Sequence, residues 1–184
     1  MQLDQEYRLR DVVQRPSPHF DARPLGTEPN LLVIHNISLP PGCFDGDDID
    51  HLFMGTLDCA SHDFYHELVN VRVSAHCVIR RDGSIRQYVP FNLRAWHAGS
   101  SSFQGKTACN DFSIGIELEG TDQSGFTSDQ YQRLIAVTRT LMDCYPGITL
   151  GSIVGHSDIA HGRKTDPGFG FDWCMFRTLL TDTD

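Results

Sequence analysis

One short segment carries most of the potential metal ligands of this chain. Residues 155–168 hold two histidines, two aspartates and two adjacent cations between glycines, and these are His156, Asp158, His161, Arg163, Lys164 and Asp166. Imidazole and carboxylate groups are ligands that zinc accepts. A lysine beside such ligands is unfavourable unless an anion arrives, such as an oxyanion. These residue types are typical of a metal-assisted site, although an ordinary polar surface turn would also explain this segment taken alone.

Two further polar residues lie in runs that predict buried strands. His35 stands at the C-terminal end of an apolar run in residues 30–36, where the side chains of a sheet emerge toward solvent. Residues 112–120 alternate between aliphatic residues on one face and Ser, Gly and Glu on the other, which includes Glu117 and Glu119. A buried acid without a partner is costly. Glu117 is therefore expected to be functional or paired with a cation, whereas exposure at the strand edge would explain Glu119.

Together these residues predict a catalytic metal site. His35, His156 and one ligand from the loop would make a three-ligand site, the number typical of catalytic zinc with a fourth position open for water. Such a metal lowers the pKa of its water to about 7 and polarises a carbonyl oxygen. Glu117 is the right type for the base and Lys164 for stabilising an oxyanion. The spacing leaves three candidates for the third ligand, namely Asp158, His161 and Asp166.

The elements that must position these residues alternate along the chain. Asp82-Gly83 between two β-prone runs predicts a hairpin over residues 75–90. Helical spacing of apolar residues predicts a long helix after Thr127-Ser128-Asp129 that ends before Pro146. Further elements are expected as a helical turn at 48–55, a helix at 63–71, a strand at 152–156 and a closing helix at 171–180. The fold class is therefore α/β (mixed α+β), a central mixed β-sheet flanked by helices.

Two loops are expected to border the site. Residues 40–60 are rich in Gly and Asp and form a candidate rim or lid. Residues 95–99 and the Ser-rich segment after them form another loop, in which Trp96 beside His97 suits a sugar or peptide surface, although a Trp covering the core is the alternative. His76, His97 and His161 are otherwise expected to be hydrogen-bonding structural residues, with His97 at the border of the groove.

Length and composition favour one domain that acts on a small molecule. The 184 residues contain 40% hydrophobic residues and no linker, so residues 1–184 are expected to form a single domain, with residues 1–29 as an extended, proline-containing arm lying on it. A formal net charge of −9 argues against nucleic acid or an anionic membrane surface as the partner. The start of the chain has no export signal, and the six cysteines form no C-x-x-C pair, so we expect a cytoplasmic protein with reduced thiols.

Several blocks of the sequence resemble one enzyme family in the same order along the chain. They cover most of the chain between about residues 16 and 173, and they are residues 32–42, 73–76, 95–99, 110–122 and 155–168. The resemblance is to the type 2 amidase and peptidoglycan-recognition-protein superfamily, and within it to the cytoplasmic amidases that act on anhydromuropeptides. The fold that this resemblance implies, a mixed sheet flanked by helices, agrees with the pattern of elements.

The resemblance also implies a role for individual residues. It implies one zinc ion per chain held by His35, His156 and Asp166, with Glu117 activating the water and Lys164 stabilising the oxyanion. It implies further that the substrate groove is lined by Asn36, Arg72 and Trp96, with His97 and Lys106 beside it. Relatives can carry more basic residues around Lys106, so contacts with the carboxylates of the stem peptide are expected from Lys106 and Arg72 alone.

The resemblance finally implies a reaction and a setting. The enzyme would hydrolyse the amide between the lactyl group of 1,6-anhydro-N-acetylmuramic acid and L-Ala in cell-wall recycling, and would indirectly regulate β-lactamase expression. We expect a monomer without an obligate protein partner. The alternatives are a recognition module that binds peptidoglycan fragments without cleaving them, and a zinc peptidase of other specificity. Recognition modules typically lack a complete metal site, whereas this chain has three ligands, a candidate base and a candidate cation.

Overall fold

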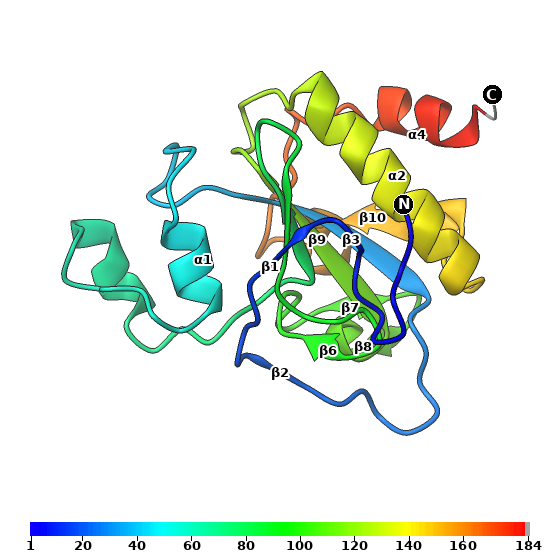
Figure 1. The fold of residues 1–184 in the computed structure, drawn as a ribbon, viewed down its shortest axis with the longest axis horizontal. Helices are drawn as coiled ribbons and strands as arrows, with labels where there is room; N and C mark the ends of the chain where they lie inside the picture. Colours follow the sequence, from blue (N-terminus) through cyan, green and yellow to red (C-terminus); the bar gives the residue numbers. More distant parts are fainter. Residues whose placement is uncertain (183–184) are drawn as a thin grey trace.

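The computed structural model describes residues 1–182, which form a six-stranded mixed sheet covered by helices (Figure 1). The strand order is β1-β5-β4-β9-β3-β10. The bounds of these strands are β1 Val13–Gln14, β3 Leu31–Ile37, β4 Cys77–Ile79, β5 Ile85–Gln87, β9 Ser113–Glu119 and β10 Ile153–Gly155. Strands β4, β9, β3 and β10 are parallel, and β5 runs antiparallel to β4 as the hairpin pattern predicts. The predicted mixed sheet flanked by helices is confirmed.

The two central strands are buried on both faces. All seven residues of β9 are buried, as are the first five of β3. On one face, Ile114, Ile116 and Leu118 pack against helices α2 (Ser128–Cys144) and α4 (Trp173–Thr181), which lie on the same side of the sheet in Figure 1. Thr127 begins α2 with a capping box, in which its side chain accepts from the backbone of Gln130. This face forms the main core.

The other face of the sheet is covered by short elements. Its apolar contacts join Leu31 and Val33 of β3 to Ala98 and Ile159. The elements on this face are β6 Arg94–Ala95, β7 Ser102–Phe103, β8 Lys106–Thr107, the 3₁₀ helix η2 Cys109–Asp111 and α3 His156–Ile159. A further 3₁₀ helix, η3 (Leu150–Ser152), leads into β10. The loop expected at residues 95–99 and in the Ser-rich segment after them contains part of a small hairpin that was not predicted, because β7, which begins at Ser102, pairs antiparallel with β8.

The first 29 residues contribute two short strands that the proline-rich pattern does not predict. β1 pairs with β5 at the edge of the sheet, and β2 (Phe20–Asp21) pairs antiparallel with β6. The half-buried Arg23 follows β2, and its guanidinium donates to the carbonyl oxygens of Phe91, Asn110, Asp111 and Ser113. These charge-assisted hydrogen bonds hold the segment across the face that carries η2.

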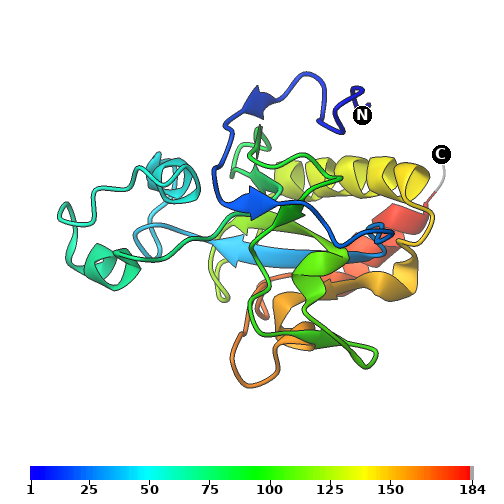
Figure 2. The same ribbon diagram turned by 90° about the horizontal axis from the view of Figure 1, so that it is seen from below.

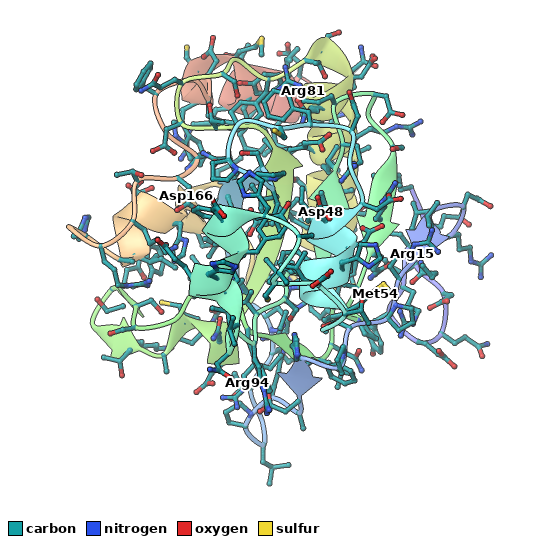
Figure 3. The ribbon with its side chains drawn as sticks, turned by 90° about the vertical axis from the view of Figure 1, so that its left-hand side faces the viewer. Arg15, Asp48, Met54, Arg81, Arg94 and Asp166 are labelled. Atoms are coloured by element: carbon teal, nitrogen blue, oxygen red, sulfur yellow. The ribbon has the colours of Figure 1, made fainter. Side chains whose placement is uncertain are left out.

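A region of two short helices projects from one side of the sheet (Figures 1 and 2). It contains α1 (Asp48–Phe53), and the helix predicted near residue 63 is a 3₁₀ helix, η1 (Asp63–Leu68). Figure 3 views the molecule from this side and labels Asp48 on α1. The buried carboxylate of Asp50 joins α1 to the sheet, because it accepts hydrogen bonds from Arg86 and from the hydroxyl of Tyr88. Among residues 1–182, no helix has the length and hydrophobicity needed to span a membrane.

Candidate metal centre

The register of the two central strands brings His35 and Glu117 together. They are paired positions of the parallel strands β3 and β9, so their side chains lie next to each other on one face of the sheet. Both are buried, with exposed fractions of 1% and 8%. Glu117 is therefore a buried acid, which is the situation in which a functional role or a cationic partner was expected for it. Glu119 is also buried and is neutralised by Arg80, so exposure at the strand edge is wrong for it.

A second strand end and a loop supply two more polar groups. Gly155 of β10 pairs with Ile34 of β3, so the next residues of the two strands, His156 and His35, lie side by side. The chain then turns back so that the amide of Ser157 donates to the carbonyl oxygen of Asp166 at 3.0 Å. This contact directs the Asp166 carboxylate, labelled in Figure 3, toward the two imidazole rings.

Three potential ligand atoms converge at this point. Nδ1 of His35 lies 3.0 Å from Nδ1 of His156, and Oδ2 of Asp166 lies 2.9 Å and 3.0 Å from these two nitrogens. The centre of such a triangle is about 1.7 Å from each corner, whereas zinc bonds to nitrogen and oxygen are roughly 2.0–2.2 Å. The three atoms are therefore close enough together to bind one metal ion, and the three residues fit such an ion.

The protonation states of these groups also suit a metal. Burial lowers the pKa of His35, so its imidazole is neutral, although the carboxylate of Asp166 opposes this shift. Burial would raise the pKa of Asp166, but the neighbouring side chains of His156 and His35 outweigh it and hold the pKa well below its usual range. A neutral imidazole and an ionised carboxylate are the forms that bind metal.

One oxygen of the Glu117 carboxyl group has no hydrogen-bond partner within the described part of the protein. Its Oε2 atom is buried and makes no hydrogen bond with residues 1–182. Burial raises its pKa well above the ordinary value, the charge of Asp166 raises it further, and the ammonium group of Lys164 lowers it. A buried carboxyl oxygen that accepts no hydrogen bond from the described residues is suited to receive a proton from a bound molecule.

A groove of 680 Å³ opens beside this cluster. Asn36, Asp122 and Lys164 give it polar groups, and the amide of Asn36 donates to the Asp122 carboxylate at 2.8 Å. Its apolar lining comes from the segment after β3 and from the projecting helices, and consists of Ile37, Leu39, Pro41, Leu52, Phe64 and Leu68. The projecting region is therefore one wall of the groove, and the volume is in the range of small-molecule sites.

The geometry distinguishes the three candidates for the third ligand. Asp166 lies within the cluster, whereas Oδ2 of Asp158 accepts the backbone N–H of Gly155 at 2.7 Å. His161 is exposed and is not part of the cluster. His76 is fully buried, and its Nδ1 accepts the N–H of Gly115, so it is a structural residue of the kind that we expected.

The residues expected to bind substrate are distributed over several surfaces. Asn36 lines the groove, but Arg72 lines a separate cavity of 200 Å³ beside His19. The indole of Trp96 stacks on His19 and donates to Asp21. Lys106 lines a third cavity with Asn30, which lies five residues before His35 in the chain, so that cavity is at the opposite end of β3. His97 contacts Nε2 of His35, the ring nitrogen that does not face Asp166.

Two groups of the site were missed by sequence reasoning. Asp122 holds Asn36 at the groove, and it sits in a short polar loop that carries no pattern of its own. The carbonyl oxygen of Ala98 accepts a hydrogen bond from Nε2 of His156 at 3.1 Å. A backbone acceptor leaves no signal in the amino-acid sequence, so only the fold reveals it.

Known proteins share both the sequence and the fold of this chain. The pattern that describes N-acetylmuramoyl-L-alanine amidases matches residues 25–169. The chain is 62% identical over 166 residues to the 1,6-anhydro-N-acetylmuramyl-L-alanine amidase AmpD of Escherichia coli, covering 90% of each protein. A crystal structure of AmpD superposes with a TM-score of 0.95 at 57% identity, covering 98% of this chain and all of the other. AmpDh3 of Pseudomonas aeruginosa, crystallised with an anhydromuramic pentapeptide, superposes with a TM-score of 0.62 at 25% identity, covering 97% of this chain and 66% of its own. The resemblance expected from the sequence blocks is confirmed, and the chain belongs to the N-acetylmuramoyl-L-alanine amidase family.

Proposed function

We propose that this amidase is a zinc enzyme in which His35, His156 and Asp166 hold the metal. The observation that carries the proposal is the triangle of their ligand atoms, with sides of 2.9–3.0 Å. Beside it lies Oε2 of Glu117, which has no hydrogen-bond partner among residues 1–182. Two imidazoles and one carboxylate are a ligand set used by catalytic zinc, which keeps a position for water or substrate. When bound, zinc would supply Lewis acidity and lower the pKa of water to about 7.

The protein groups around the triangle account for the remaining steps of amide hydrolysis. Glu117 would take the proton of the attacking water and pass it to the leaving nitrogen, and its buried oxygen beside the triangle supports this role. The ammonium group of Lys164, at the edge of the groove, would stabilise the negative charge that develops on the carbonyl oxygen. The buried position of His35 and Glu117 keeps bulk water away from this exchange.

We propose an anhydromuropeptide as the substrate, cleaved between the lactyl group of 1,6-anhydro-N-acetylmuramic acid and L-Ala. The names of AmpD and the ligand crystallised with AmpDh3 support this choice. The groove offers polar contacts from Asn36 and Lys164 and an apolar wall from the projecting helices, which suits a sugar joined to a peptide. We propose further that the enzyme acts as a monomer in the cytoplasm, in cell-wall recycling, and that by consuming its substrate it indirectly regulates β-lactamase expression.

Mass spectrometry of peptide release tests this proposal. Purified protein is incubated with anhydromuropeptide as isolated, after chelation, and after zinc is restored, and an ordinary muramyl peptide serves as the matched substrate control. We expect release of the free peptide, its loss on chelation and its return with zinc, with the anhydro sugar preferred. Binding of intact substrate without release under all three conditions would instead identify a recognition module.

A further inference from the structure

The outer nitrogens of both imidazoles in the metal cluster contact two consecutive residues of one loop. Nε2 of His35 lies 2.9 Å from Nδ1 of His97, and Nε2 of His156 lies 3.1 Å from the carbonyl oxygen of Ala98. The hydrogen bonds therefore come from a segment that supplies no ligand to the cluster. A group that fixes the outer nitrogen of a ligating imidazole determines which nitrogen carries the proton and how the ring is oriented.

The contact at His35 has a defined direction once its Nδ1 faces a metal. His35 must then carry its proton on Nε2, so Nδ1 of His97 has to accept it. This leaves the proton of His97 on its own Nε2, which lies 3.1 Å from the hydroxyl oxygen of Ser113 on β9. His35, His97 and Ser113 therefore form a chain of hydrogen bonds that leads from the cluster into the sheet.

The contact at His156 has a defined direction in the same way, once its Nδ1 faces a metal. A carbonyl oxygen only accepts, so His156 carries its proton on Nε2 and its Nδ1 presents a lone pair to the cluster. The same oxygen of Ala98 accepts from Nη2 of Arg163 at 2.6 Å. Because Arg163 also donates to the carbonyl oxygen of Ser100, it holds the backbone that orients His156.

The segment itself is held in place from two further directions. The side-chain oxygen of Asn110 accepts the N–H groups of both His97 and Ala98, at 3.1 Å and 2.8 Å. Gly115 of β9 makes room for the His97 ring, because a Cβ atom there would lie 2.5 Å from its Cγ and Nδ1 atoms. Both features indicate a segment that is fixed before any ligand binds.

We propose that His97 and the carbonyl group of Ala98 act as a positioning element that orients His35 and His156 for zinc. His97 then works through His35, beneath the cluster, instead of touching substrate at the border of the groove. This inference rests on the zinc site of the proposed function and adds to it the residues that prepare its ligands. Loss of such a partner typically weakens metal binding about 10–100-fold.

Zinc affinity of paired variants tests the role of His97. His97→Phe keeps a ring in the space cleared by Gly115 but removes the acceptor, whereas His97→Asn keeps an acceptor near the position of Nδ1. His161→Phe changes an exposed histidine outside the cluster and is the matched control. Dissociation constants come from competition with a chromophoric chelator, and thermal unfolding of the metal-free proteins checks that each variant is folded.

We expect His97→Phe to bind zinc at least about tenfold more weakly than the wild type, and His97→Asn to recover most of the loss. Equal affinity of the wild type and His97→Phe, or equal losses in His97→Phe and His97→Asn, would overturn the inference. If the wild type itself binds no zinc, the proposed zinc site fails instead. A measurement on unmutated protein avoids any folding defect: ¹⁵N NMR of the zinc-loaded wild type should show His97 protonated at Nε2, and a proton on Nδ1 would overturn the role.

Discussion

A methyl group added at Gly115 should disturb the metal site without touching any ligand. The Cβ atom of Gly115→Ala would lie 2.5 Å from Cγ and Nδ1 of His97, whereas carbon atoms in contact are normally about 3.5–4.0 Å apart. The ring must therefore move by about 1 Å. Its Nδ1 now lies 2.9 Å from Nε2 of His35, and a shift of this size takes the pair beyond hydrogen-bonding distance.

The expected cost has two parts that can be measured separately. Overpacking of this kind destabilises a protein by about 1–3 kcal/mol. For a chain of this length that corresponds to a fall in Tm of about 2–12 °C. The lost orientation of His35 should in addition weaken zinc binding about 10–100-fold.

Gly125→Ala is the matched control, because a Cβ atom at Gly125 meets no other atom within 4 Å. Differential scanning calorimetry of the metal-free proteins gives Tm, and competition with a chelator gives the zinc dissociation constant. We expect both quantities to change in Gly115→Ala and neither in Gly125→Ala. A Gly115→Ala protein with the Tm and zinc affinity of the control would refute the close packing of Gly115 against His97 and its link to the metal.

The remaining predictions concern the groups around the cluster. Glu117→Gln should keep zinc but lower kcat about 10²–10⁴-fold in a peptide-release assay, because the base is lost; an unchanged kcat would exclude that role. Folding raises the pKa of Glu117 above its ordinary value of 4.5, so the folded state holds this proton more tightly than the unfolded state. The stability of the metal-free protein should therefore fall as pH rises from 4.5 to the pKa of Glu117 in the folded protein. Glu117→Gln should flatten this part of the pH profile of Tm, and identical profiles would contradict the shift. Lys164→Ala should lower kcat about 10²–10³-fold with zinc content unchanged, whereas normal turnover would leave Lys164 a surface charge. Asp166→Asn should lose its zinc, measured by atomic absorption, while Asp158→Asn retains it. The reverse result would show that Asp158, and not Asp166, is the third ligand.

The order of strands and helices could be predicted from the sequence because their patterns are local. The run that ends in His35 and the alternation around Glu117 both reflect strands buried on two faces, and their parallel register then makes the two residues neighbours. Helix α2 begins at the capping residues that the sequence shows. The strands at residues 13–14 and 20–21 were not predictable, since contacts with distant residues hold this part of the chain. One example is Ser113, whose carbonyl oxygen accepts a hydrogen bond from Arg23.

Residue types narrowed the set of candidate metal ligands, but they did not identify the third ligand. Spacing left Asp158, His161 and Asp166 equal, because a turn-rich loop gives no periodicity from which directions follow. The structure separates them through one backbone contact, from Ser157 to the carbonyl of Asp166, which folds the loop back on itself. The contact of His97 with His35 could not be predicted for a similar reason, since the two rings meet only when residues 62 positions apart come together.

A zinc titration of the metal-free enzyme with anhydromuropeptide as substrate tests the central claim most directly. We predict that the rate of peptide release rises in proportion to added zinc and stops rising at one equivalent per chain, and that Asp166→Asn shows no such rise. Full activity in the metal-free protein would contradict the assignment of His35, His156 and Asp166 as the metal site. So would an Asp166→Asn protein whose activity reaches its maximum at the same amount of zinc as the wild type.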